Sequence, residues 1–248
     1  MMVLERSFQT VVALLLLLTF TGQARAQAAL QAHLDSQQGE WVLGVPVELT
    51  VSVTNVSSAS AQTYSDLSPL WEGISFFISE DGSAFHVFNG PEWDLGRTMD
   101  IMPGTITLKP GAKVQASFSL LWNGPANNKG QDPTDGFAFP HVGTYFVKVR
   151  ASSKLGDLMS NVIRVVIRQP QSDDAAIWEA LKADKELARY YGFPNGAAGE
   201  GEKLQQLLNK YPNSSHAASM KKALAVYARQ RAEIEQVNKA QSAPQQQH

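Results

Sequence analysis

The chain has 248 residues, contains no cysteine and carries a formal net charge of −2 at pH 7. The absence of cysteine excludes thiol nucleophiles, zinc–thiolate sites and redox motifs. The balanced charge leaves no basic stripe, which excludes nucleic acid as an expected partner, and the length allows one medium-sized domain with an appendage.

An apolar run covers residues 11–20 and is followed by Ala24, Arg25 and Ala26. The run is too short for a bilayer core, which takes ~20 apolar residues to cross, and small-x-small is the pattern that signal peptidase cleaves. We therefore predict that residues 1–26 are a signal peptide and that the mature chain has no membrane span, with an uncleaved anchor as the alternative. Because exported eukaryotic sandwiches usually carry disulfides, this cysteine-free chain is expected to be bacterial, and periplasmic or secreted.

Alternation of apolar and polar residues dominates residues 27–170. Its clearest example is the run Val45, Val47, Leu49, Val51 and Val53, in which every second residue is apolar. A period of two predicts strands with one buried face. About seven such short strands predict an immunoglobulin-like antiparallel β-sandwich over residues 27–170, so that the chain is mainly β.

Two turns and one tyrosine refine this prediction. Asp81 and Gly82 predict a hairpin, because Asp-Gly tolerates positive φ. Pro110 and Gly111 predict a second turn, in which proline sets φ and glycine takes the left-handed conformation. Tyr145 stands where a late strand begins, and we expect its hydroxyl to bond back to preceding backbone, as in a tyrosine corner. The alternative is an ordinary aromatic strand residue.

Helical spacing replaces the alternation after residue 170. Apolar residues recur at this spacing in three segments, which contain Ile177, Leu181, Ala188 and Tyr191, then Leu204, Leu207, Leu208 and Tyr211, and then Ala217, Met220, Leu224 and Tyr227. We predict about three helices within residues 171–240, the first capped by Asp173 or Asp174. Residues 241–248 are rich in glutamine and are predicted to be a disordered tail.

The consecutive residues 211–214 are Tyr-Pro-Asn-Ser, and Ala217 and Leu224 follow them. With these residues the helical segment resembles the tetratricopeptide class, at the join between repeats in bacterial envelope proteins of that class. Proline ends one helix beside the cap of the next, and small residues allow the helices to approach closely. The likeness covers about one repeat of ~34 residues, whereas a stable solenoid needs about three.

Four short motifs stand out in the strand-rich segment, at residues 44–47, 108–111, 143–145 and 160–162. With these motifs the segment resembles the sandwich domains of many exported, uncharacterised bacterial proteins. A weaker likeness is to the sandwich of an intracellular proteinase inhibitor from bacilli, which shares the opening strand pattern. Neither resemblance supplies a catalytic residue.

No catalytic, metal or cofactor site is predicted. No two histidines have metal-ligand spacing, and the chain has neither a Gly-x-Ser-x-Gly elbow nor a glycine loop for phosphate. A hydrolase with a Ser–His–Asp triad dispersed over the fold stays open as an alternative. The polar loop at residues 123–139 offers oxygen ligands for calcium, but its carboxylates lack the regular spacing of a calcium loop.

Two groups of residues are candidates for binding. Trp71 and Trp93 could stack on sugars as a carbohydrate-binding module. The stripe Leu204, Leu207 and Tyr211 must be covered, either by the strands or by another protein. Our leading hypothesis is a non-enzymatic exported binding or adaptor protein of the bacterial envelope with a protein partner; the carbohydrate-binding module and the hydrolase are the alternatives.

Overall fold

The computed structural model of the chain describes residues 29–67, 73–88, 90, 104–123, 134–193 and 198–242. The predicted signal peptide lies outside these ranges. Residues 241 and 242, which the sequence assigned to a disordered tail, form the end of the last helix, and residues 243–248 are again outside the described ranges.

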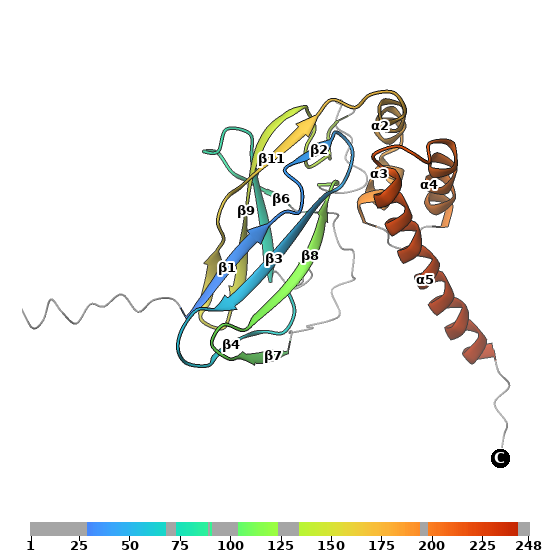
Figure 1. Ribbon diagram of the computed structural model, residues 1–248. Coiled ribbons are helices and arrows are strands. Elements are labelled where there is room, and N and C mark those ends of the chain that lie inside the picture. The colour runs from blue at the N-terminus through green and yellow to red at the C-terminus, as the bar shows by residue number, and fades with distance from the viewer. Residues whose placement is uncertain are drawn as a thin grey trace, which may run out of the picture.

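Strands precede helices along the described part of the chain (Figure 1). The strands are β1 (Leu30–Asp35), β2 (Glu40–Val42), β3 (Val47–Asn55), β4 (Ala61–Tyr64), β5 (Ile74–Ser79), β6 (His86–Phe88), β7 (Thr105–Leu108), β8 (Lys113–Leu120), β9 (Gly143–Ser153), β10 (Gly156–Met159) and β11 (Ile163–Arg168). The helices are α2 (Asp173–Ala183), α3 (Lys185–Gly192), α4 (Ala198–Lys210) and α5 (Ala217–Ser242). The architecture is therefore mixed, with antiparallel sheets followed by helices.

The described strands form three sheets. The first has the order β1-β3-β8, the second has the order β2-β11-β9-β5-β6 with β10 also paired to β9, and the third joins β4 to β7. Among these pairs only β2 and β11 are parallel. This pair departs from the antiparallel arrangement predicted from the sequence. Most of the strand region separates β2 from β11, so no hairpin dictates their relative direction.

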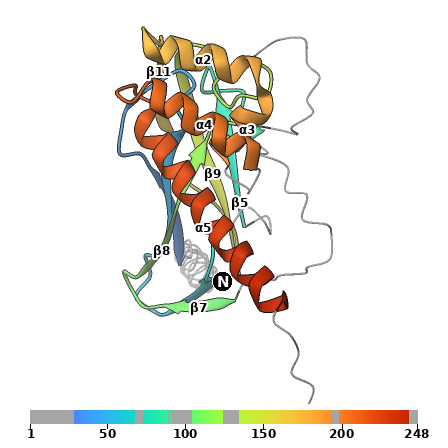
Figure 2. The same cartoon turned by 90° about the vertical axis from the view of Figure 1, so that its right-hand side faces the viewer.

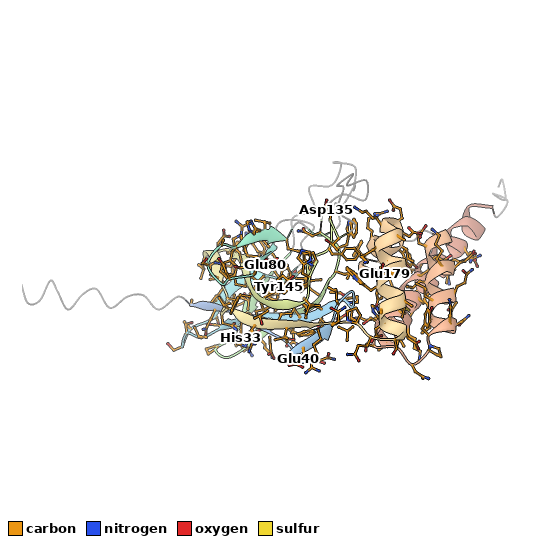
Figure 3. All side chains as sticks on the ribbon, turned by 90° about the horizontal axis from the view of Figure 1, so that it is seen from above. His33, Glu40, Glu80, Asp135, Tyr145 and Glu179 are labelled. Atoms are coloured by element: carbon orange, nitrogen blue, oxygen red, sulfur yellow. The ribbon has the colours of Figure 1, made fainter. Side chains whose placement is uncertain are left out.

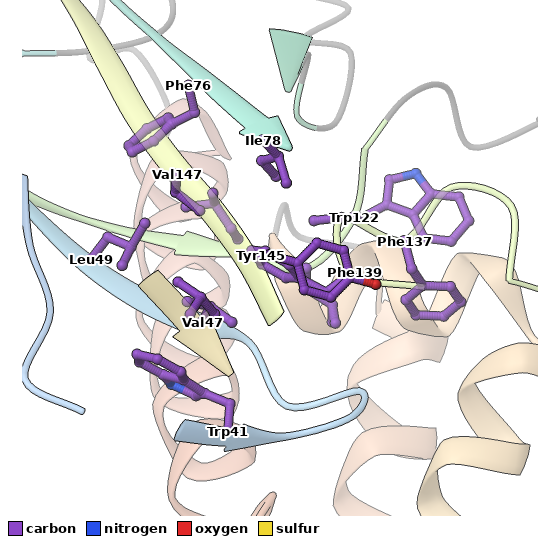
Figure 4. Close-up of a cluster of buried hydrophobic side chains, with 14 of the residues drawn as sticks. Trp41, Val47, Leu49, Phe76, Ile78, Trp122, Phe137, Phe139, Tyr145 and Val147 are labelled. Atoms are coloured by element: carbon purple, nitrogen blue, oxygen red, sulfur yellow. The ribbon is translucent and has the colours of Figure 1, made fainter. Parts of the chain in front are cut away.

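The core lies between the first and second sheets. Alternate residues of β3 are buried, as the period of two predicts: Val47, Leu49, Val51 and Val53. Phe118 of β8 meets Phe76 of β5 across the two sheets, with ring centroids 5.3 Å apart at 65°, an edge-to-face arrangement. Figure 4 shows this cluster continuing through Tyr145 to the buried Trp122.

Hydrogen bonds confirm the predicted role of Tyr145. Its hydroxyl donates to the carbonyl oxygen of His141 at 3.0 Å and accepts from the N–H of the same residue at 3.1 Å. Burial raises the pKa of Tyr145, and the bond to His141 offsets part of that rise. The two bonds fix the loop that enters β9. The predicted turns are also present, because Gly82 and Gly111 both have φ near 77°.

Two asparagine amides hold separate strands together. The side chain of Asn161 accepts from the N–H of Leu34 at 2.9 Å and donates to its carbonyl at 3.0 Å. It thereby joins β1 of the first sheet to the segment between β10 and β11 of the second. Asn55 is buried and donates to the carbonyl of Leu108 at 2.9 Å. This bond ties the end of β3 to the end of β7.

Four helices are described where the sequence predicted about three. Asp184 ends α2 and caps α3, since its side chain accepts from the N–H of Leu187 at 3.1 Å. A short carboxylate that competes for backbone N–H groups favours a cap over a helix interior. The predicted cap of the first helix is wrong: Ser172 is the N-cap of α2, and Asp173 and Asp174 lie in its first turn. None of the described helices is long and apolar enough to span a bilayer.

The helices pack against one end of the strands, as the view from above shows (Figure 3). Trp178 of α2 contacts Phe137, with ring centroids 4.6 Å apart. Gly44 lies against the indole: a Cβ at this position would be 2.6 Å from Trp178 Cε3, and φ is 88°. Glycine is therefore required at position 44 for two reasons: its φ is positive, and the indole leaves no room for a Cβ. Lys222 of α5 adds an ion pair with Glu48 of β3 at 2.6 Å.

Candidate functional site

The two tryptophans predicted as a sugar platform, Trp71 and Trp93, lie outside the described residues. The tryptophans that the structure does describe are Trp41, Trp122 and Trp178, and all three are buried. They belong to the core and to the junction with the helices.

The predicted stripe on α4 is covered by neighbouring helices. Leu204 is 0% exposed, and Leu207 and Tyr211 are half-buried. The cover comes from α3 and α5, whose Tyr190 and Tyr227 meet with ring centroids 6.1 Å apart beside α4. Leu204 is therefore covered within the helical region, and its surface is not available for binding. The pair α4 and α5 alone could not bury both of its apolar faces, and α3 supplies the additional apolar surface that covers α4.

A polar cluster lies where α5 begins. His216 is fully buried, and its Nδ1 is 3.4 Å from the hydroxyl of Tyr191. Burial lowers the pKa of His216 to about 4, although the nearby Asp174 acts in the opposite direction. Asp174 accepts from the N–H and the Oγ of Ser215, each at 2.8 Å. These bonds connect α2 and α3 to the two residues that directly precede α5.

The cluster contains the residue types of a hydrolytic triad but not its bonds. In a triad the serine hydroxyl donates to histidine, and the other ring nitrogen bonds the carboxylate. Here Ser215 donates directly to Asp174, while His216 faces Tyr191. The Nε2 of His216 has no hydrogen-bond partner among the described residues. These groups therefore connect helices and do not assemble an activated nucleophile.

A hollow of about 450 Å³ opens beside the turn between β5 and β6. Glu80, Asp81, His86 and Tyr145 are among its lining residues, and Figure 3 shows Glu80 near Tyr145. Asp81 accepts hydrogen bonds from the side chain of Ser83 at 2.6 Å and from its N–H at 2.8 Å. The side-chain bond is the largest of the hydrogen bonds that lower the pKa of Asp81. The Asp81 carboxylate is thus bonded within the turn between β5 and β6, and the Tyr145 hydroxyl is bonded to the loop that enters β9.

A second hollow of about 370 Å³, the junction groove, lies between the strands and the first two turns of α5. Its polar lining consists chiefly of Gln38, Glu48, Thr50, Ser117, Ser219 and Lys222. Glu48 and Lys222 neutralise each other across it at 2.6 Å. The groove therefore offers hydroxyl and amide groups beside a neutral ion pair.

The outward side of the second sheet carries cations between apolar side chains. We call it the basic face; it consists of Phe77, Val87, Phe146, Lys148, Arg150, Met159 and Arg164. Strand register brings these residues together, since Phe77 is opposite both Val87 and Lys148, Phe146 is opposite Arg164, and Arg150 is opposite Met159. Val87 and Met159 are 48% and 49% exposed.

The cations of the basic face differ in their partners. Arg150 bonds Ser75 at 3.0 Å and pairs with Asp157 at 3.6 Å. Lys148 lies 3.9 Å from the ring centroid of Phe85, and within the described ranges neither Lys148 nor Arg164 forms an ion pair. Two of the three cations thus have no carboxylate partner among the described residues; Arg164 donates to the hydroxyl of Thr144 at 3.4 Å.

Sequence reasoning missed the basic face because it followed the buried side of each strand. The signal was present: Phe146, Lys148 and Arg150 are alternate residues, so one strand must place them on one side. Which neighbouring strands extend this row could not be read from the sequence, because it depends on sheet order.

Metal ligands do not gather in the part of the chain that the structure describes, where no three His, Asp or Glu side chains are close enough to hold an ion. Residues 124–133 of the polar loop considered for calcium lie outside that part.

Comparison with known proteins identifies no family. No family model matches the chain, and no curated protein matches it. Solved structures give weak likenesses. The sporulation control protein Spo0M of Bacillus subtilis is 13% identical, with 63% of this chain and 56% of that chain covered and a TM-score of 0.31. A β-glucosidase of Listeria innocua is 14% identical, with 56% of this chain and 16% of that chain covered and a TM-score of 0.30. At these TM-scores the likenesses carry no conclusion about function.

Proposed function

We propose that the chain is a non-enzymatic, exported binding protein of the bacterial envelope. An immunoglobulin-like sandwich is its rigid body, and the basic face is its contact surface for an acidic protein partner. The observation that carries the proposal is the combination of exposed apolar side chains and available cations on one sheet face. The bond from Tyr145 to His141 and the two facing sheets support the immunoglobulin-like assignment. The pattern of residues 1–26 supports export.

The composition of the basic face favours a protein partner. Exposed apolar residues rimmed by polar ones mark interaction surfaces, and Val87 and Met159 are about half exposed. Arginine is enriched in such surfaces, and Arg150 and Arg164 both lie on this one. The chain as a whole has a net charge of −2, so the positive charge is local. Charge complementarity then selects an acidic partner.

The aromatic rings of this region favour protein over single-stranded nucleic acid. Base stacking needs open ring faces. Lys148 already lies over the ring of Phe85, and Gly82 lies so close to Phe146 that a Cβ there would be 3.3 Å from the ring. These rings hold the turn between β5 and β6 on the sheet. The reachable groups are therefore aliphatic side chains and cations.

The test is capture from envelope extract by the immobilised purified chain. We compare the wild type with a face variant, Val87→Asp combined with Arg164→Glu. Both positions are exposed, so the fold should be retained. A matched control combines Val56→Asp with Lys221→Glu, two exposed positions away from the basic face.

The expected result is an acidic protein that the wild type and the control retain and that the face variant loses. Its retention by the wild type should weaken as salt is raised, because exposed charges are screened. Equal retention by the face variant and the control, or retention of no protein by the wild type, would contradict the proposal.

A further inference from the structure

The two walls of the junction groove are fixed by contacts outside it. One wall consists of Glu48 and Thr50 of β3 with Ser117 of β8, and the other is formed by Ser219 and Lys222 of α5. The contact of Trp178 with Phe137 holds the helices on the strands, and the bonds from Ser215 to Asp174 hold the start of α5. Figure 2 shows α5 in front of the strands, and Figure 1 shows that it diverges from them beyond this junction. A groove between elements held in this way is formed before any ligand arrives.

The polar groups in the groove carry no net charge. Glu48 and Lys222 form an ion pair at 2.6 Å, so a charged ligand would have to compete with an existing partner. The hydroxyls of Thr50 and Ser117 lie 3.5 Å apart on adjacent strands, and either can donate or accept. The groove thus offers several donors and acceptors to a neutral ligand that carries many hydroxyls.

The size of the groove suits a small molecule. Its volume of about 370 Å³ lies at the lower end of small-molecule pockets, which span about 300–1,000 Å³. Trp41 and Leu49 border the groove but are only 5% and 1% exposed, so its reachable groups are chiefly those of the polar side chains. A neutral ligand of this size that carries many hydroxyl groups is a sugar.

We infer that the junction groove binds a neutral mono- or disaccharide. Its hydroxyls exchange hydrogen bonds with Thr50, Ser117 and the Glu48–Lys222 pair. This site shares no residue with the basic face.

The test is titration of the purified chain with glucose, N-acetylglucosamine, maltose and cellobiose, followed by backbone amide shifts in NMR. At least one sugar should produce saturable shifts at Thr50, Ser117 and Ser219. Thr50→Val removes one hydroxyl and keeps the β-branched shape, so it should weaken binding by about tenfold. Thr54→Val makes the same change on the same strand outside the groove and should leave the affinity unchanged.

Three results would overturn the inference. They are an absence of saturable shifts with all four sugars at millimolar concentration, shifts confined to residues outside the groove, and an affinity that Thr50→Val does not alter. A wild-type melting temperature for both threonine variants ensures that a loss of affinity reports the missing hydroxyl and not a disturbed fold.

Discussion

Trp178 joins the helices to the strands, so its replacement tests whether the two parts unfold as one unit. Its side chain is 5% exposed, its ring contacts Phe137 at 4.6 Å, and Gly44 lies against its edge. Trp178→Ala removes these contacts and leaves a cavity. Buried Phe or Trp to Ala changes cost about 3–5 kcal/mol, a large share of the ~5–15 kcal/mol by which native domains are stable.

Denaturant unfolding followed by two signals provides the assay. Far-UV circular dichroism reports mainly the helices, and tryptophan fluorescence reports the surroundings of the five tryptophans, among them the buried Trp41 and Trp122. In the wild type the two transitions should coincide, as expected of a single cooperative unit. In Trp178→Ala the free energy of unfolding should fall by about 3–5 kcal/mol. The helical signal should also be lost at lower denaturant than the fluorescence signal, because the helices lose the contact of Trp178 with Phe137 and Gly44.

Two further variants calibrate the result. Trp178→Phe keeps an aromatic ring against Phe137 and should cost less than half as much as Trp178→Ala. Leu155→Ala changes a side chain that is 63% exposed and should alter stability by no more than about 0.5 kcal/mol. The reasoning is refuted if Trp178→Ala costs less than about 1 kcal/mol, or if the two signals already separate in the wild type.

Three other substitutions test individual contacts by thermal or denaturant unfolding. Leu204→Ala should cost about 2–5 kcal/mol because the side chain is buried between helices; a near-neutral effect would mean that α3 and α5 do not cover it. Tyr145→Phe should cost about 1–3 kcal/mol, since it leaves both backbone groups of His141 without their partner; an unchanged melting curve would contradict the corner. His216 takes up a proton near pH 6.5 when unfolded but only near pH 4 when folded. The wild type should therefore lose about 3 kcal/mol of stability as the pH falls through this window. His216→Asn should flatten that dependence, and an equally steep loss in the variant would assign it to other groups.

The sequence by itself determined the local elements. The alternation from Val47 to Val53 specifies β3 and its buried side, because successive side chains of a strand point to opposite faces. Gly111 specifies its turn, because a positive φ costs glycine nothing. Tyr145 could be assigned its bond to His141, because the acceptor lies only four residues away. In each case the deciding interaction is within the residue or with close neighbours in the chain.

Only the tertiary structure decided which faces meet. The side chain of Asp184 caps α3 by accepting from the N–H of Leu187, and this bond competes with continued helical hydrogen bonding. The spacing of apolar residues fits one long helix as well as two short ones, so it does not predict the break at Asp184. The parallel pairing of β2 with β11 and the junction groove each join segments that are distant in the sequence. The cover of Leu204 depends on how three consecutive helices pack together. Apolar burial is non-directional, so a stripe requires a cover without specifying which one. The basic face likewise needed the order of β6, β5, β9 and β11, because one strand specifies the side on which Lys148 lies but not its neighbours.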